Sequence, residues 1–260
     1  MLILALDTTT RAGSVAVAKD GTIITIFVGD AGRTHSERLP GDIQMVLEQA
    51  GFQSADVDLY AVCSGPGSFT GLRVGIATIQ GLALAHGRLV LPVSTLEALA
   101  WTALWSHTRR DTRSDTRSEP FAPDDLIATW LDAQRREVFA CVFAVPGPTW
   151  RPDRLVPGEL PRLEQRQAPA VGIPSNLVAR WGTQIDDRTI WIVGDAVDAA
   201  TLGLMRSRGA RVHRIVPGPL AAILARLAWL RVDEAVRPHA VRPFYVRRPD
   251  AELARDRRHA

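Results

Sequence analysis

The sequence of 260 residues contains almost no lysine, very little cysteine and no long apolar run. Lysine and arginine number 31 together, and Lys19 is the single lysine among them. A P-loop requires a Gly-Lys-Ser/Thr sequence, and a Schiff-base enzyme requires a lysine in a pocket. Lys19 stands before an Asp-Gly pair that predicts a hairpin turn, so the sequence excludes both of these chemistries.

The two cysteines, Cys63 and Cys141, are too few for a disulfide framework or a four-cysteine metal site. Both stand in apolar runs, which predicts that they are small core residues. No run of about 18 apolar residues predicts a membrane-spanning helix. The N-terminus has the pattern of a strand rather than of a signal peptide. We therefore expect a cytoplasmic protein that does not bind a membrane.

The rest of the composition is that of an ordinary folded protein. Apolar residues make up 46% and charged residues 23%, which argues against wholesale disorder and against a coiled coil. The net charge of +3 and the pI near 9.4 permit contact with nucleic acid without requiring it. The arginine excess has two interpretations, a phosphate-binding surface or a merely solvated one, and the composition favours the second.

The hydrophobic pattern of the first half predicts the element order βββαβαβ, which is typical of a ribonuclease-H-like unit. Pro40 and Gly41 are expected to confine the first regular helix to the part that follows them. The expected strands are residues 1–6, 14–19, 22–28, 59–63 and 89–93, and the expected helices are residues 35–50 and 71–86.

The second half resembles a shortened, degenerate copy of the first. Its expected strands are residues 126–131, 137–145, 189–193 and 210–215, and its expected helices are residues 198–207 and 220–236. The predicted organisation is an N-terminal lobe (1–105), a mobile insertion loop (106–125), a second lobe (126–218), a helix that packs back on the first lobe (219–237) and an arginine-rich tail (238–260).

The most informative segment is residues 63–75, which read CSGPGSFTGLRVG. It is a strand end, a loop of glycine, proline and serine, and a helix start, where backbone N–H groups attract anions such as phosphate. The alternative is that the glycines only permit a tight turn, and the residues alone favour the two interpretations equally.

Asp7 ends the first strand, which would suit a two-metal nuclease. Such a nuclease would need a second acidic residue at the end of the fourth strand. Cys63 and Ser64 occupy that position, so the nuclease hypothesis fails there.

The expected helix 71–86 carries small residues at a spacing of four, at Gly71 and Gly75 and again at Ala77, Gly81 and Ala85. Small residues at that spacing let another backbone approach closely. This predicts either intimate packing on the sheet or a helix-to-helix interface with a partner. Met45 widens the apolar face of the preceding helix, so the two helices together offer a docking surface.

Seven segments, in order along nearly the whole chain, resemble the TsaB (YeaZ) family. The most specific of them is residues 65–75. The others are residues 4–10 (LALDTTT), 14–17 (SVAV), 35–39 (HSERL), 92–96 (PVSTL), 131–139 (LDAQRREVF) and 242–247 (RPFYVR).

The resemblance implies an α/β protein with the actin/Hsp70-like (ASKHA) fold, in which two ribonuclease-H-like lobes are present and the second is reduced. It implies a non-catalytic subunit in the biosynthesis of N6-threonylcarbamoyladenosine (t6A) at position 37 of tRNAs that read ANN codons. The implied partners are the catalytic paralogue TsaD, which forms a heterodimer through the two first-lobe helices, the ATPase TsaE, and tRNA through the complex. Without TsaD, the same surface is expected to form a homodimer.

The resemblance also assigns residues. TsaD-type proteins carry a metal-binding His-x-x-x-His pair where this chain has Thr95 and Leu99, so no catalytic or metal-binding residue is expected here. The expected partner interface is Leu39, Ile43, Met45, Val46, Gly71, Val74, Gly75, Thr78, Gly81 and Ala85. A weak phosphate site is expected at Asp7, Thr8, Thr9, Gly65, Gly67 and Ser68.

The nucleotide-binding loops of the fold's ATP-binding members are only partly matched. Residues 7–10 read DTTT and residues 132–136 read DAQRR, and neither loop holds the glycine that leaves room for a triphosphate. We expect weak or no ATP binding by the isolated chain. Binding of ATP or ADP at an interface within the complex is the alternative. The alternative function is a stand-alone ATP-dependent phosphotransferase or hydrolase, for which Asp7 and Asp195 are the candidate bases.

Overall fold

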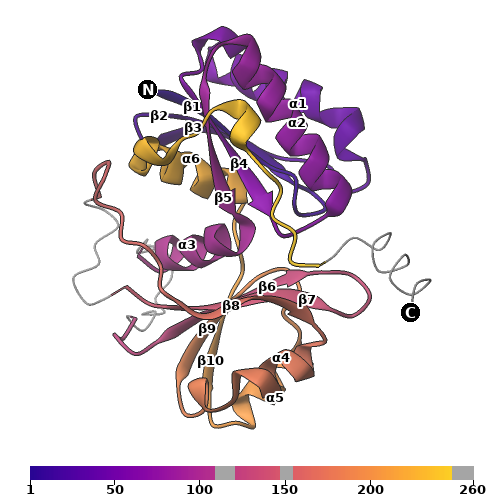
Figure 1. Cartoon of the computed structure of the whole chain (residues 1–260), viewed down its shortest axis with the longest axis vertical. Coiled ribbons are helices and arrows are strands. Elements are labelled where there is room, and N and C mark those ends of the chain that lie inside the picture. Colours follow the sequence, from indigo (N-terminus) through magenta and orange to yellow (C-terminus); the bar gives the residue numbers. More distant parts are fainter. Residues whose placement is uncertain (109–120, 147–154, 248–260) are drawn as a thin grey trace.

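The computed structural model describes residues 1–108, 121–146 and 155–247, and contains two five-stranded sheets, one above the other (Figure 1). The strand orders are β3-β2-β1-β4-β5 and β8-β7-β6-β9-β10, so both sheets have the same topology. In each sheet the first three strands are antiparallel and the last two run parallel to the central strand. This is the ribonuclease-H-like arrangement expected for both lobes of an actin-like fold.

The first lobe has its helices α1 and α2 on one face of the sheet. In its strands Leu2–Asp7, Ser14–Lys19 and Leu59–Gly65, side chains alternate between the two faces, and all but Lys19 are buried. Its elements are β1 (Leu2–Asp7), β2 (Ser14–Lys19), β3 (Thr22–Val28), α1 (His35–Ala50), β4 (Leu59–Gly65), α2 (Phe69–Ala85), β5 (Leu89–Ser94) and α3 (Thr95–Thr108).

The second lobe keeps the complete sheet, and its reduction lies in the helices, which have eight residues each where α1 and α2 have 16 and 17. The second-lobe elements are β6 (Leu126–Asp132), β7 (Val138–Ala144), β8 (Gln165–Gly172), α4 (Pro174–Trp181), β9 (Thr189–Val193), α5 (Ala199–Arg206) and β10 (Arg211–Ile215).

Helix α6 (Leu220–Leu230) returns from the second lobe and packs on β1, β2 and β4 of the first. Alanines on that face of the sheet, Ala5 and Ala16 among them, leave room for the close approach. The backbone N–H of Ala221 donates to Oγ of Ser14 at 3.1 Å. Helix α3 contacts α6 above and β6, β7 and β9 below, so it lies between the two sheets. One continuous apolar core therefore joins the lobes.

Several elements differ from the sequence prediction. Helix α1 runs through Pro40. The helix tolerates this proline because it loses only one hydrogen bond near its N-terminus, and because the ring lies on the exposed face. Helix α6 ends at Leu230 rather than at residue 236. Helices α3 and α4 and strand β8 were not predicted. The predicted insertion loop begins inside α3, and its residues 109–120 lie outside the described residues.

After α6 the chain crosses back over both lobes as residues 236–247, a 3₁₀ turn (Pro238–Ala240) followed by extended chain, which we call the C-terminal strap (Figure 1). Val236 pairs with Val90 of β5, and the N–H of Phe244 donates to the carbonyl of Ser64 at 2.6 Å. Gln80 of α2 donates to the carbonyl of Pro238 at 2.8 Å. The first part of the predicted tail is thus packed, whereas residues 248–260 lie outside the described residues.

Candidate functional site

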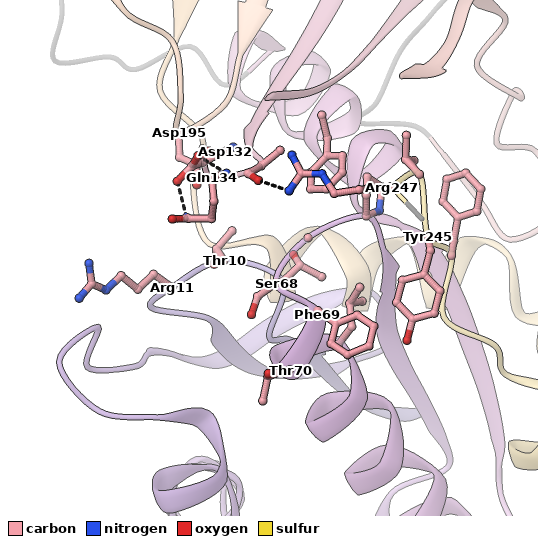
Figure 2. Close-up of a pocket in the computed structure, with 18 of the residues that line it drawn as sticks. Thr10, Arg11, Ser68, Phe69, Thr70, Asp132, Gln134, Asp195, Tyr245 and Arg247 are labelled. Carbon is pink, nitrogen blue, oxygen red and sulfur yellow. Dashed lines mark hydrogen bonds between the residues drawn. The ribbon is translucent and has the colours of Figure 1, made fainter. Parts of the chain in front are cut away.

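A cleft of about 790 Å³ opens between the two lobes (Figure 2). Three parts of the chain form its walls: the β1–β2 loop with the start of α2, the β6–β7 turn with Asp195, and the C-terminal strap. The lining residues are Thr9, Thr10, Arg11, residues 66–70, Leu72, residues 132–135, Phe139, Asp195 and residues 244–247.

The carboxylate of Asp7 is turned into the protein rather than toward the cleft. It is 2% exposed. One oxygen accepts from the N–H (2.8 Å) and the hydroxyl of Thr9, and the other accepts from the hydroxyl of Thr10 at 3.0 Å. Asp7 therefore shapes the β1–β2 loop, and the predicted phosphate site is wrong at this residue.

Two further predicted phosphate ligands, Thr8 and Gly65, are also covered. The Thr8 hydroxyl is buried and donates to the carbonyl of Gly71 at 2.8 Å. The carbonyl of Phe244 lies directly over the position of a Cβ on Gly65. Both positions are corrections to the predicted set, because the packing leaves no space for a ligand there.

The remaining three predicted phosphate residues, Thr9, Gly67 and Ser68, do line the cleft. The hydroxyl of Ser68 accepts from the N–H of Gly71 at 3.2 Å and caps α2. The N–H of Ser68 donates to the carbonyl of Thr9 at 3.0 Å. The first bond closes the start of α2 and the second joins it to the β1–β2 loop, so together they fix this wall of the cleft.

The opposite wall carries two carboxylates (Figure 2). Asp195 accepts from the N–H of Asp132 at 2.9 Å, and Asp132 accepts from the N–H of Gln134 at 2.8 Å. The side chain of Asp195 reaches the cleft, yet shielding by the surrounding protein raises its pKa. The hydrogen bond from the N–H of Asp132 lowers the pKa, and the charge of Asp132 raises it, so the net shift is upward. Asp198, not Asp195, caps the following helix, by accepting from the N–H of Thr201 at 2.7 Å.

The strap brings aromatic side chains to the rim of the cleft. The rings of Phe69 and Tyr245 lie side by side with centroids 5.4 Å apart (Figure 2). The guanidinium of Arg73 lies 4.0 Å over the Phe69 ring, and its Nε donates to the Tyr245 hydroxyl at 3.2 Å. Sequence reasoning did not assign this cluster, because Arg73 and Tyr245 are 172 residues apart. Its only sequence signal is that both residues stand in family-like segments.

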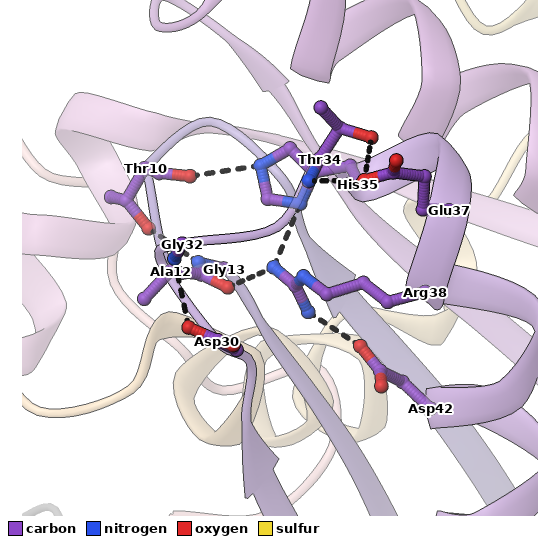
Figure 3. A network of polar contacts seen from close by, with 10 residues as sticks. All are labelled: Thr10, Ala12, Gly13, Asp30, Gly32, Thr34, His35, Glu37, Arg38 and Asp42. Atoms are coloured by element: carbon purple, nitrogen blue, oxygen red, sulfur yellow. Dashed lines mark hydrogen bonds and ion pairs between the residues drawn. The ribbon is translucent and has the colours of Figure 1, made fainter.

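A polar network ties the first turns of α1 to the β1–β2 loop (Figure 3). The buried guanidinium of Arg38 bonds the carbonyl of Ala12 and the carboxylate of Asp42. His35 Nδ1 lies 2.9 Å from Arg38, and its Nε2 lies 3.1 Å from the carbonyl of Thr10. Burial, and then the charge of Arg38, lower the pKa of His35. The network fixes the loop that forms one wall of the cleft.

The predicted partner interface divides into covered and accessible positions. Leu39, Ile43 and Val46 face the first sheet, and Gly71 and Gly75 pack against Thr8. These five cannot touch a partner in this conformation, because the chain's own core covers them. Met45, Val74 and Thr78 are half-buried, and Gly81 and Ala85 are exposed.

Thr95 and Leu99, where the resemblance predicts that a histidine pair is replaced, lie in α3 and are closed to solvent. Thr95 is 0% and Leu99 is 1% exposed. Within residues 1–108, 121–146 and 155–247, no group of three or more His, Cys, Asp and Glu side chains is placed to hold a metal ion. In the same ranges no helix has the length and apolarity to cross a membrane.

Comparison with known proteins gives consistent matches. The family model for "TsaD: tRNA N6-adenosine threonylcarbamoyltransferase" matches residues 28–141. The tRNA threonylcarbamoyladenosine biosynthesis protein TsaB of Escherichia coli (strain K12) is 43% identical over 100 residues, which are 38% of this chain and 43% of that protein. The chain therefore matches less than half of the length of this curated relative.

Two solved structures match almost the whole chain. YeaZ from Pseudomonas aeruginosa superposes with a TM-score of 0.63 and 27% identity, covering 94% of this chain and 99% of that one. A Pseudomonas aeruginosa protein described as similar to peptidase YEAZ superposes with a TM-score of 0.67 and 26% identity, covering 95% and 99%. The match thus includes both lobes.

Proposed function

The chain belongs to the TsaB (YeaZ) family, and from this premise we propose that it is an accessory subunit in tRNA threonylcarbamoyladenosine biosynthesis. In this proposal the chain binds a TsaD-type transferase and supports it, without carrying out the transfer itself. The observation that carries the proposal is the outer face of α2 around Gly81.

Among the residues that the structure describes, none packs closely enough on position 81 to require a glycine there. A Cβ at position 81 would meet nothing within 4 Å, in contrast to Gly71 and Gly75, which must be small to clear Thr8. Glycine within a helix costs about 0.5–1 kcal/mol relative to alanine. A surface glycine that the fold does not need is explained if a second backbone must approach closely there.

The surroundings of Gly81 support the same interpretation. Ala77 and Ala85 are exposed at the neighbouring helical positions, and Leu84 is 62% exposed. Met45 of α1 is half-buried beside the apolar core under both helices. Helices α1 and α2 contact each other and lie side by side (Figure 1). This α1–α2 face therefore offers a partly apolar surface on which another helix pair can dock.

Two observations support an accessory rather than a catalytic role. A buried threonine and a buried leucine stand where the paralogue's metal-binding histidines are expected. The stand-alone phosphotransferase or hydrolase requires a base that faces the cleft. Of its two candidate bases, Asp7 has its oxygens engaged by Thr9 and Thr10, and Asp195 faces the cleft but already accepts from the N–H of Asp132. We therefore keep the accessory function and do not propose the alternative.

The proposal is tested by co-purification with the TsaD-family protein of the same organism. Gly81→Arg places a long charged side chain on the α1–α2 face and is expected to abolish complex formation. Gly203→Arg is the matched control, because Gly203 is also an exposed helical glycine with open space around it, on α5 of the second lobe. Both variants should unfold at the parent temperature. Normal binding by Gly81→Arg would show that the assigned face is wrong.

The remaining partner assignments extend this proposal. In the absence of TsaD we expect the α1–α2 face to form a homodimer, which Gly81→Arg should convert to a monomer in light scattering. The ATPase TsaE and tRNA are expected to join through the complex. Binding of ATP or ADP at the subunit interface is an open alternative of the same proposal. Cytoplasmic localisation belongs to the same proposal.

A further inference from the structure

Solvent-exposed aromatic side chains line the rim of the interlobe cleft. Phe69 and Phe244 are each 43% exposed, and Tyr245 is half-buried between the strap and α2. Phe69 starts α2, whereas the other two come from the C-terminal strap. Fixed, exposed aromatic rings at a cavity mouth are typical of sites where a flat ligand stacks.

The cluster is held rigid by contacts that do not cover it. Arg73 joins the Phe69 ring by a cation–π contact at 4.0 Å and the Tyr245 hydroxyl by a hydrogen bond of 3.2 Å, yet its side chain is exposed. The strap is fixed behind the rings by the bond from the N–H of Phe244 to Ser64. A ligand would therefore meet a preorganised platform and would lose little affinity to ordering it.

The charges around the platform suit phosphate. Arg11 and Arg73 are exposed around the cleft, and Arg247 is paired with Glu137. The anions that face the cleft are Asp132 and Asp195, and both accept hydrogen bonds from backbone N–H groups of the second lobe. The platform itself carries only the positive charge of Arg73. Arginine both stacks on flat rings and pairs with phosphate.

We propose that this aromatic rim, which consists of Phe69, Arg73, Phe244 and Tyr245, binds single-stranded RNA by stacking unpaired bases, with Arg73 pairing with a phosphate. The choice of RNA over DNA rests on the proposed function, whereas the stacking chemistry rests on the rim alone. A single strand fits because its bases are free to stack, whereas the bases of a duplex are already stacked on one another.

The test measures the anisotropy of a fluorescently labelled single-stranded RNA of about 12 nucleotides, a length that one groove of this kind covers, titrated with the full chain at low salt. Phe69→Ala should weaken binding by about tenfold or more, because one stacked base contributes that much. Phe69→Leu should weaken it similarly, since leucine keeps the apolar volume but has no flat ring. Phe69→Trp should bind the RNA as tightly as the parent, because tryptophan also has a flat ring.

A variant of Arg73 tests the contribution of its charge to RNA binding separately from the contribution of stacking. Arg73→Gln should weaken binding and make the slope of log affinity against log salt shallower by about 0.7, the value for one phosphate on a single strand. Arg206→Gln removes an equal, exposed charge on α5 and is the matched control, which should leave the affinity within twofold. Thermal unfolding at the parent temperature confirms that each variant is folded.

Three outcomes would overturn the proposal. The affinity of Phe69→Ala could equal that of the parent, a duplex of the same length could bind as well as the single strand, or AMP or ATP could displace the RNA at micromolar concentration. The last result would identify a free-nucleotide site instead. Because the catalytic partner is absent from this experiment, its failure leaves the Gly81→Arg test of the proposed function untouched.

Discussion

Gly75 of α2 and Thr8 of the β1–β2 loop are packed so closely that any Cβ at position 75 would overlap the Thr8 hydroxyl. The same hydroxyl donates to the carbonyl of Gly71, one helical turn earlier. The glycines at 71 and 75 therefore lock α2 onto the loop that forms one wall of the cleft. Of the three glycines of α2, Gly81 is the one that is exposed and has open space around it.

The first prediction follows from this contact. Gly75→Ala should lower the free energy of unfolding by about 1–3 kcal/mol, because the added methyl group must displace the loop. Gly81→Ala should leave it unchanged or raise it by up to about 1 kcal/mol, because the helix gains propensity without a clash. Urea unfolding of the two variants measures both effects. Equal stability of the two would contradict the packing described here.

The second prediction concerns pH and His35. Burial and Arg38 lower the pKa of His35 in the folded chain, whereas the unfolded chain has a pKa of about 6.5. As the pH falls below about 6.5, the unfolded state binds more protons, so His35 contributes a loss of stability until it is protonated in the folded state too.

His35→Gln should therefore make the stability profile flatter between about pH 5 and 7. The control is His239→Gln, because His239 is exposed and lies outside the α1 network. Urea midpoints measured across this range give the profiles. Identical slopes for the parent and His35→Gln would refute the prediction.

The third prediction concerns the two thiols. Burial raises the pKa of Cys141 to about 12 and raises the pKa of Cys63 well above its ordinary value. Both side chains are 0% exposed, so neither forms an accessible thiolate at pH 8. A chromogenic disulfide reagent should label neither cysteine in the native protein and both after unfolding in guanidinium. Rapid labelling of one native thiol would show that its part of the core opens.

The fourth prediction concerns the attachment of the strap to the second lobe. Arg247 donates to the carbonyl of Ala133 at 2.8 Å and pairs with Glu137. Arg247→Gln and Glu137→Gln should each reduce stability, with a coupling energy of about 1 kcal/mol in a double-mutant cycle because the pair is partly solvated. Hydrogen exchange in residues 241–247 should speed up in both variants. Strict additivity would show that the pair does not hold the strap.

The elements that the sequence predicted well are those whose pattern reflects a single environment. Strands β2, β3 and β9 and the C-terminal end of α1 agree with prediction because alternation, an Asp-Gly turn and a closing Gly51 are local signals. The prediction that Pro40 and Gly41 confine the regular helix to the part after them is wrong. Helix α3 was missed because it is buried between two sheets and is apolar on most sides, which removes the helical period. Strand β8 was missed because its segment is proline-rich and polar.

The candidate site shows the same division. The glycine loop at the start of α2 was found because its residues are contiguous, and Thr9, Gly67 and Ser68 do line the cleft. The interface prediction was wrong at Gly71 and Gly75, because a stripe of small residues does not reveal which side faces the protein's own sheet. The aromatic rim was not assigned, because nothing in the sequence places Tyr245 beside Phe69.

Residue identities and their order were enough to indicate the resemblance to the TsaB (YeaZ) family, the two related lobes, and Thr95 and Leu99 in place of the histidine pair that the resemblance predicts for the paralogue. The folded structure, and not a sequence pattern, shows that Asp7 turns inward, that Gly81 is exposed and that the strap brings Tyr245 to Phe69. Those outcomes depend on contacts between segments far apart in the chain. Such contacts follow from how two sheets, α3 and α6 share one core, which no local pattern encodes.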